Sequence, residues 1–245
     1  MGFDGCVDTI ARPISQAASA NRPASAFPTI RSLGEFLIGK AEKSCSIELQ
    51  IQARQPGGNL SYLSRAAGGL GLSVSCIGML GAPGKTDPLF GDMPCTLYPF
   101  AAPMQCTCLE FTDGKVFLAP DYPLNGDVWN RVLAATDNQA PQLFRNAHLL
   151  ALVNWSELDF AHGLWQAILE TMQETQTDKG RFAFFDLCDI SRRSGDECDA
   201  VLRIVGGFTK YRTTILSLNE NEALLAGERL LQDASTLEQI AGGIR

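Results

Sequence analysis

A strand-then-helix pattern that recurs through the second half of the chain constrains the fold more than any other feature. Short apolar runs suited to buried strands begin near residues 147, 181 and 213, at intervals of 34 and 32 residues. Each run precedes an amphipathic segment, and the helices are expected at 158–173, 196–206 and 219–228. Such intervals suit right-handed βαβ crossovers. The pattern predicts an α/β fold with a parallel sheet between helices.

The first half of the chain adds strands of another kind. A strand is expected at 2–7, a helix follows Pro28, and Ser46–Arg54 alternates apolar and polar residues, which predicts a strand with one face in water. In 105–119 the dipeptide Asp113-Gly114 favours a tight two-residue hairpin turn. These strands are expected to lie outside the buried parallel sheet.

One α/β domain over residues 1–245 suits the length of the chain. A further strand of the repeating pattern is due near residue 245, where the sequence ends after a segment of helical character at 235–245. The spacing therefore predicts a domain that is incomplete at its C-terminal end.

Composition excludes several classes of protein. The chain is 45% apolar and 19% charged, which excludes disorder, and it has no apolar run of the roughly 18 residues that a membrane span needs. Its net charge is −7 without a basic cluster, which argues against nucleic acid as a partner. Its eight cysteines form no CxxC pair and no secretory signal is present, so we expect reduced thiols and a cytoplasmic location.

Two polar groups in the first sixty residues are candidates for binding a ligand. Gly57-Gly58-Asn59 connects a strand to a helix, and its bare backbone N–H groups can meet a polar ligand there. Asp4 and Asp8 lie at or just past the end of the first expected strand, where ligands bind in open α/β sheets. The alternatives are structural: Asn59 as a helix N-cap and Asp8 as a cap of the following segment.

A second polar pair follows the last expected strand. Asn219 and Glu222 lie three residues apart on one face of the first helical turn. Such a pair could hold a hydrated Mg²⁺ near phosphates. An ordinary capping box, in which the two residues only close the helix N-terminus, explains them equally well.

Two further patterns in the sequence are candidates for a phosphate or metal site. Residues 80–86, Leu-Gly-Ala-Pro-Gly-Lys-Thr, resemble the end of a phosphate-binding P-loop, and Asp186 after an apolar run would be its magnesium ligand. Met79 stands where the motif needs glycine, and Asp87-Pro88 opposes the helix that should follow. No direct metal site is expected, because the two histidines lack ligand spacing and Cys106 and Cys108 read as packing.

Taken in order, these motifs resemble the ribokinase-like, or PfkB-type, family of carbohydrate kinases. The resemblance extends over nearly the whole chain. The stretches that carry it are GFDGCVDTI, PGGNLSYLSRAAGGLGLSVSCIGMLG, LEFTDGK, FFDLCDISRR and LNENEALLAG. Each motif is weak alone, but five in the family's order are specific.

The resemblance implies a fold, a site and cofactors. Segments about 44–55 and 104–119 would form a small β lid over a sugar, and the sugar hydroxyls would meet Asp8 and Gly57-Gly58-Asn59, with Asp4 a weaker candidate. Asn219 and Glu222 would order Mg²⁺ and its waters near the phosphate transferred from ATP or ADP. The exposed strand 46–54 would also allow two lids to pair in a homodimer.

Two departures from the family pattern limit what the resemblance implies. The family's catalytic base is the Asp of a Gly-Ala-Gly-Asp segment, and no Gly-x-Gly-Asp occurs in this sequence, so no catalytic residue is assigned and the motif is expected beyond Arg245. Tyr62 stands where many members carry a sugar-binding Asn. The expected function is the sugar-binding half of a sugar kinase, inactive alone. The alternatives are a non-catalytic sugar-binding or regulatory protein and a P-loop nucleotide binder.

Overall fold

The computed structural model describes residues 1–120, 124, 126–173, 177–230 and 236–239. The chain divides into two compact units, which we describe separately. Unit 1 comprises residues 1–5, 58–102 and 123–245, and unit 2 comprises residues 6–57 and 103–122. Unit 2 therefore contains both segments that the sequence analysis assigned to a lid.

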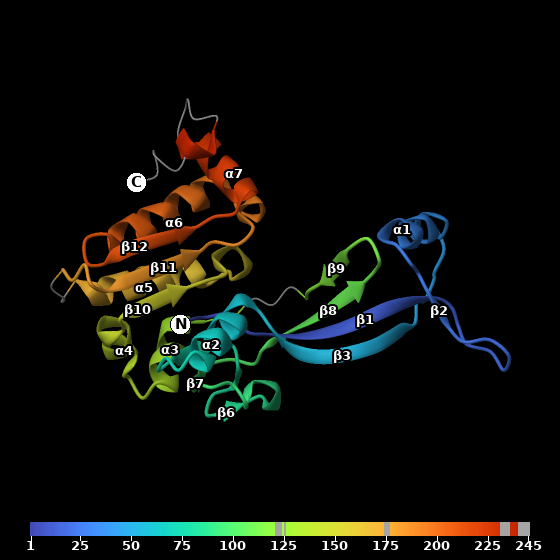
Figure 1. Cartoon of the computed structure of the whole chain (residues 1–245), viewed down its shortest axis with the longest axis horizontal. Helices are drawn as coiled ribbons and strands as arrows, with labels where there is room; N and C mark the ends of the chain where they lie inside the picture. Colours follow the sequence, from blue (N-terminus) through green and yellow to red (C-terminus); the bar gives the residue numbers. More distant parts are fainter. Residues whose placement is uncertain (121–123, 125, 174–176, 231–235, 240–245) are drawn as a thin grey trace. The chain divides into compact units, whose positions relative to one another are not determined.

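The three predicted strand–helix repeats form the C-terminal part of unit 1. Strands β10 (Leu149–Leu152), β11 (Phe182–Asp186) and β12 (Thr213–Ser217) are parallel neighbours in one sheet (Figure 1). The helices that follow them are α5 (Ala161–Met172), α6 (Gly195–Phe208) and α7 (Glu220–Leu230). The predicted α/β class with a parallel sheet is confirmed.

The first residues of the chain extend this sheet. The Gly2 N–H donates to the Ala151 carbonyl beside β10, and the Ile77 N–H of β4 (Ser75–Gly78) donates to the Met1 carbonyl. Strand β4 pairs in parallel with β7 (Thr96–Pro99). The array therefore runs β7, β4, residues 1–4, β10, β11 and β12.

Aromatic packing fixes the helices that follow β10 and β11 against the sheet. Phe185 of β11 packs between Trp165 of α5 and Phe208 of α6, with ring centroids 5.4 Å and 5.1 Å away. All three side chains are fully buried. Burial of each large ring contributes several kcal/mol of hydrophobic stabilisation, so this layer anchors the C-terminal part of unit 1.

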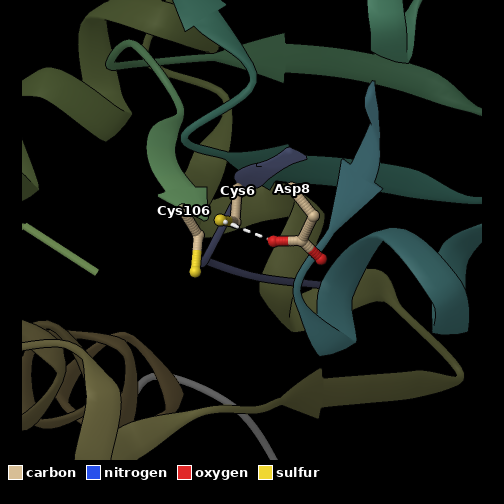
Figure 2. A group of neighbouring side chains, drawn as sticks. All are labelled: Cys6, Asp8 and Cys106. Carbon is tan, nitrogen blue, oxygen red and sulfur yellow. Dashed lines mark hydrogen bonds between the residues drawn. The ribbon is translucent and has the colours of Figure 1, made fainter. Parts of the chain in front are cut away.

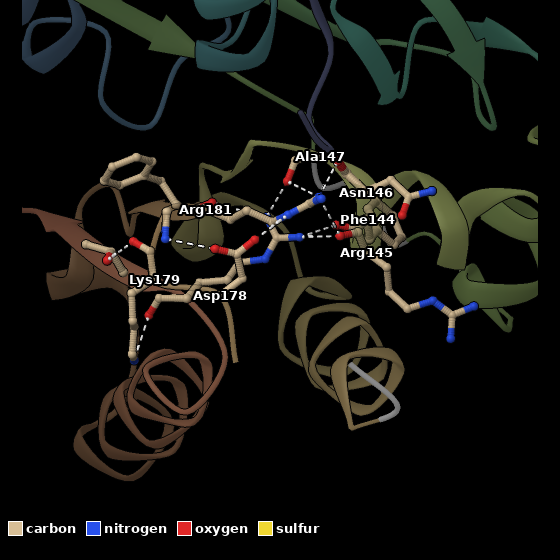
Figure 3. A network of polar contacts seen from close by, with 11 residues as sticks. Phe144, Arg145, Asn146, Ala147, Asp178, Lys179 and Arg181 are labelled. Carbon is tan, nitrogen blue, oxygen red and sulfur yellow. Dashed lines mark hydrogen bonds and ion pairs between the residues drawn. The ribbon is translucent and has the colours of Figure 1, made fainter. Parts of the chain in front are cut away.

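Unit 1 contains two further helices, which precede β10 in the sequence. They are α3 (Val128–Ala135) and α4 (Ala140–Asn146). Helix α4 is not among the helices expected from the sequence. The last carbonyl groups of α4 have no partner within the helix, and two arginines from distant segments bind them (Figure 3). Arg212 donates to the Phe144 carbonyl at 2.6 Å and to the Ala147 carbonyl at 2.8 Å, and Arg181 donates to the Arg145 carbonyl at 3.1 Å.

Unit 2 is a five-stranded sheet with β1 (Cys6–Gln16) at its centre. Strand β3 (Leu49–Gly57) pairs antiparallel with β1, and β8 (Met104–Glu110) pairs parallel with it (Figure 1). Strands β2 (Ser25–Ala26) and β9 (Lys115–Leu118) complete the sheet. Helix α1 (Ile30–Ile38) places Leu33 in a buried cluster with Ala11, Phe27 and Leu109.

Three expectations for these segments were wrong in detail. The predicted strand 2–7 is divided, because residues 1–4 belong to the sheet of unit 1 whereas β1 begins at Cys6 and belongs to unit 2. Strand β3 does not bury its apolar side, since Leu49 and Ile51 remain 41% and 53% exposed. The hairpin is present, but its last pair is Glu110 with Lys115, so four residues form the turn instead of two.

The remaining elements are short, apart from α2 (Asn59–Gly69). Strands β5 (Gly81–Ala82) and β6 (Lys85–Thr86) form a two-stranded ribbon, and 3₁₀ turns occupy Pro88–Phe90, Trp155–Glu157 and Ile190–Arg192. The helical segment predicted at 235–245 lies largely outside the described residues. Among the helices described, none is long and apolar enough to cross a bilayer.

Candidate functional site

Asp8 and Gly57 lie side by side in unit 2. Asp8 is the third residue of β1, not a residue beyond a strand end as the sequence analysis expected, and β1 pairs there with β3. A Cβ atom added to Gly57 would lie 2.3 Å from Oδ2 of Asp8 and 2.6 Å from its Cγ. The Asp8 carboxylate therefore occupies the space that a side chain at position 57 would need, and any residue larger than glycine there would displace the carboxylate.

The Asp8 carboxylate is partly accessible to solvent and is also fixed by a hydrogen bond within the protein. Its side chain is half-buried, and the Cys6 thiol donates a 3.2 Å hydrogen bond to Oδ1. A carboxylate accepts several hydrogen bonds in its ionised form, so acceptor capacity remains for a ligand hydroxyl. This capacity distinguishes Asp8 from a residue that only supports the fold.

Gly58 and Asn59 continue the chain from Gly57 into helix α2 of unit 1. Gly58 has φ of 85° and ψ of 146°, a backbone conformation that favours glycine, and it provides no side-chain cap. Asn59 is exposed, and its Nδ2 lies 3.5 Å from Oδ2 of Asp186 at the end of β11. Asn59 is thus the first helical residue and not the N-cap considered in the sequence analysis.

Asp4 supplies the missing cap of α2. It is fully buried, its Oδ1 accepts the Leu60 N–H at 3.1 Å, and its Oδ2 accepts Nδ2 of Asn154 at 2.6 Å. Burial raises the pKa of the Asp4 carboxyl to about 7, although both hydrogen bonds act in the opposite direction. The candidate sugar-binding carboxylate at position 4 is therefore engaged in holding the helix, and no part of it is exposed.

Asn219 and Glu222 form a closed capping box at the start of α7. The Asn219 N–H and Nδ2 donate to the two carboxylate oxygens of Glu222 at 3.0 and 2.6 Å, and the Glu222 N–H donates back to Oδ1 of Asn219 at 3.0 Å. Burial raises the pKa of Glu222, and the negative charges of Asp186 and Asp189 raise it further. A cation nearby would relieve that repulsion, so the capping box and a role beside Mg²⁺ are compatible.

The carboxyl ends of the unit 1 strands bring additional polar residues to one edge. Asn154 follows β10 and Asp186 ends β11, beside Asn219 after β12. Asn154 is not among the site residues predicted from the sequence, and Asp186 was predicted only as part of the P-loop alternative. Their position after a predicted strand was the available signal, because ligands bind at that end of parallel strands.

The P-loop alternative does not fit the structure. Residues 81–86 form the β5–β6 ribbon, with Gly81 paired to Thr86, and a three-residue 3₁₀ turn follows at Pro88–Phe90. Asp87 caps that turn by accepting the Leu89 N–H. Since a P-loop needs a helix N-terminus after its Lys-Thr, the expected phosphate cradle is absent at this segment.

Sequence comparison supports the assignment that the motifs suggested. The family model described as prokaryotic ketohexokinase matches residues 1–241. The ketohexokinase of Haloferax volcanii is 26% identical over 236 residues. That alignment covers 92% of this chain and 62% of the relative, so the chain spans less than two thirds of the length of this relative.

Comparison with solved structures supports the fold. The PfkB protein of a Polaromonas species matches 99% of this chain and 71% of its own length, with a TM-score of 0.54 and 11% identity. A sugar kinase of Pyrococcus horikoshii matches 93% of this chain and 67% of its own, with a TM-score of 0.52 and 10% identity. At such identities the likeness establishes the ribokinase-like α/β architecture alone.

Proposed function

Because the chain belongs to the prokaryotic ketohexokinase family, we propose that it carries the sugar-binding part of a ketohexose kinase. The predicted ribokinase-like carbohydrate kinase family is confirmed, and the ketohexokinase family is a finer assignment than the sequence motifs gave. The whole protein would transfer a phosphoryl group from a nucleotide to a hydroxyl of the sugar. The ketohexokinase relative suggests a ketohexose as the sugar. The sequence of this chain does not identify the sugar by itself, because Tyr62 stands where many family members carry a sugar-binding Asn.

The contact between Asp8 and Gly57 carries this proposal. It places a half-exposed carboxylate against a residue without a side chain, at the point where the chain turns into α2. We propose that Asp8 accepts hydrogen bonds from two sugar hydroxyls, while Gly57, Gly58 and Asn59 offer backbone and amide groups to the same ligand. Charge-assisted hydrogen bonds of this kind are about twice as strong as neutral ones.

Unit 2 is the proposed lid. It contains the strands that the family resemblance assigns to that role, and in the described residues no helix covers the exposed side of β3. Apolar side chains on that strand, Leu49 and Ile51, support pairing of two lids in a homodimer. Dimerisation, a cytoplasmic location and the absence of nucleic acid as a partner remain predictions.

Mg²⁺ and ATP or ADP are the cofactors that this function implies. Asn219 and Glu222 fit a place beside the metal, because Glu222 lies in the negative field of Asp186 and Asp189. When bound, Mg²⁺ neutralises the charge of the phosphates. The role of these residues would be to orient its water ligands, with the exposed Asn219 nearer to solvent than the buried Glu222.

A non-catalytic sugar binder is the second candidate, and one sequence observation favours it. The sequence has no Gly-x-Gly-Asp segment, which the resemblance identifies as the source of the catalytic base and of the anion hole. We therefore expect this chain to bind a sugar without phosphorylating it. Restoration of phosphoryl transfer by a longer form with that motif would identify the kinase, and continued inactivity would identify the binder.

Sugar binding is tested by calorimetry and thermal shift with ketohexoses such as fructose and aldohexoses such as glucose. We expect the ketohexose to bind and to raise Tm, and Asp8→Asn to lose at least tenfold in affinity. Glu48→Gln, a matched charge removal at an exposed position of unit 2, should bind as the parent does. Equal binding by the Asp8→Asn variant and the parent would refute the assignment of Asp8.

A further inference from the structure

Two thiols and a carboxylate meet on one face of the unit 2 sheet. Cys6, Asp8 and Cys106 each present one metal-ligating atom, and these atoms all lie within 4.8 Å of one another. Figure 2 shows the Cys6 thiol directed at the Asp8 carboxylate, with the Cys106 side chain beside them. The sequence alone predicts only a packing role for Cys106 and no direct metal site, so this cluster was not expected.

Strand pairing explains why the three groups converge. Cys6 and Asp8 are two positions apart on β1, so their side chains lie on the same face. Cys106 on the parallel strand β8 is the register partner of Asp8. On the other side of β1, Gly57 opposite Cys6 has no side chain to fill the space. The cluster is thus held by two strands that are far apart in the sequence.

These ligands suit a soft divalent cation. Zn²⁺ binds thiolate sulfur at about 2.3 Å and carboxylate oxygen at about 2.0–2.2 Å, so ligand atoms around a tetrahedral ion lie about 3.5–3.8 Å apart. The three ligand atoms lie within 4.8 Å of one another, and the Cys6 sulfur is 3.2 Å from Oδ1 of Asp8, so side-chain movements of about 1 Å would bring them to these separations. Asp8 is half-exposed, and a water molecule could complete the tetrahedral set of ligands.

Charge on the metal-bound site suits a divalent cation. Burial raises the pKa of the Cys6 thiol, and Cys6 and Cys106 are only 8% and 7% exposed, so the thiolate charges would form only as the ion displaces the two protons. The basic Arg54 opposite Thr9 belongs to the other face of the sheet and does not offset them. On binding, Zn²⁺ forms two Zn–S bonds and one Zn–O bond, and both thiol protons pass to solvent.

We propose that Cys6, Asp8 and Cys106 form a binding site for one Zn²⁺ ion. The second part of the inference rests on the proposed function: because Asp8 is also the proposed sugar ligand, Zn²⁺ and the sugar compete for its carboxylate. Zinc would then inhibit sugar binding at this site.

Titration of the chain with Zn²⁺ against a chromophoric chelator tests the site directly. Co²⁺ serves as a spectroscopic probe, since its sulfur-to-metal absorption reports the number of thiolate ligands. We expect one tight ion per chain, with affinity lowered at least tenfold in Cys6→Ser and in Cys106→Ser. Cys45→Ser changes an exposed cysteine of the same unit and should leave the titration unchanged. Parent-like affinity in both cluster variants would overturn the proposal.

A third variant keeps the test independent of folding. Asp8→Asn should weaken Zn²⁺ binding and keep the full cobalt–thiolate absorption, because both sulfur ligands remain. Circular dichroism establishes that each variant is folded, and Cys106→Ala replaces Cys106→Ser if the hydroxyl is not tolerated in the buried strand. Unchanged zinc affinity in folded Asp8→Asn and Cys106→Ala together would exclude the cluster.

Competition with the sugar separates the two proposals. Saturating ketohexose should lower the apparent Zn²⁺ affinity, and Zn²⁺ should lower the sugar affinity by the same factor. Zinc bound by the cluster without any sugar binding would refute the proposed function and leave the metal site intact. Sugar binding with parent-like zinc affinity in the cluster variants would refute the metal site alone. If both ligands bind without affecting each other, Asp8 is not shared.

Discussion

Asn154 donates a 2.6 Å hydrogen bond from Nδ2 to Oδ2 of Asp4, from a position 150 residues further along the chain. The contact is buried, and Asn154 adopts φ of 60° and ψ of 40°. Oδ1 of Asn154 is buried without a hydrogen-bond partner among the described residues. The structure thus gives Asp4 and Asp8, four positions apart, different tasks: Asp4 fixes the start of α2, and Asp8 remains accessible.

The first prediction concerns the pH dependence of folding stability. The pKa of Asp4 is raised from 3.8 to about 7, so between these values the folded chain holds a proton that the unfolded chain has released. The free energy of unfolding should therefore fall as pH rises from about 4 to 7, by at most about 4 kcal/mol. Denaturant unfolding at a series of pH values measures this slope.

Asp4→Asn should remove most of that slope. Its amide oxygen still accepts the Leu60 N–H, and Nδ2 can donate to Oδ1 of Asn154 once that amide has turned. The matched control is Asp137→Asn, at an exposed position, which should keep the slope of the parent. An undiminished slope in the Asp4→Asn variant would show that other groups cause it.

The second prediction tests the bare backbone beside Asp8. Gly57→Ala forces a Cβ atom against the Asp8 carboxylate, so we expect at least a tenfold loss of sugar affinity and a stability loss of about 1–3 kcal/mol. Gly34→Ala in α1 of the same unit meets nothing within 4 Å and should stabilise the chain by about 0.5–1 kcal/mol. Calorimetry and urea unfolding measure both effects; parent-like sugar binding by Gly57→Ala would contradict the prediction.

The third prediction concerns the segment that resembles a P-loop. Lys85 lies in a two-residue strand of the β5–β6 ribbon, where no helix N-terminus is available for phosphate. Any affinity for ATP or ADP should therefore be the same before and after Lys85→Ala. Equilibrium binding of a fluorescent nucleotide measures this, and a tenfold loss would restore the P-loop alternative.

The three strand–helix repeats of unit 1 could be predicted because each repeat leaves a pattern within a short stretch of sequence. The strand–helix spacing located β10, β11 and β12, since a buried strand and an amphipathic helix each leave a pattern within about fifteen residues. The division of the predicted strand 2–7 could not be found in this way. It depends on Gly5, whose Cβ would lie 2.0 Å from the Met79 carbonyl oxygen, a contact with a residue 74 positions away.

In the candidate site, too, local sequence patterns predicted some residues, whereas others depend on contacts between distant segments. The pattern of a carboxylate near the first strand and a Gly-Gly turn was enough to select Asp8 and Gly57, which the structure brings into contact. The pattern alone could not separate Asp4 from Asp8, although the family resemblance made Asp4 the weaker candidate. Only the position of the α2 N-terminus shows which carboxylate caps the helix. The cysteine cluster likewise depends on the parallel pairing of β1 with β8, which no spacing within either strand reveals.

The last prediction concerns the two arginines that close α4. Arg212 is 3% exposed, and burial lowers the pKa of its guanidinium, whereas its hydrogen bonds to the Phe144 and Ala147 carbonyls favour the charged form. Arg212→Met keeps the apolar stem and removes these donors, which leaves the buried Phe144 carbonyl of α4 without its partner, while Arg181 still donates to the Arg145 carbonyl. We expect a stability loss of about 3 kcal/mol.

Hydrogen exchange should locate that loss in α4, because its carbonyl dipoles lose the positive charge at the helix C-terminus. Arg212→Lys should recover part of the stability, since an ammonium group retains the charge but cannot reach several carbonyls in the fixed geometry of a guanidinium. The matched control is Arg203→Met on the exposed side of α6, which should change the free energy of unfolding by less than about 0.5 kcal/mol. If Arg212→Met proves as stable as this control, the prediction is wrong, and the carbonyl groups at the end of α4 do not need hydrogen bonds from Arg212.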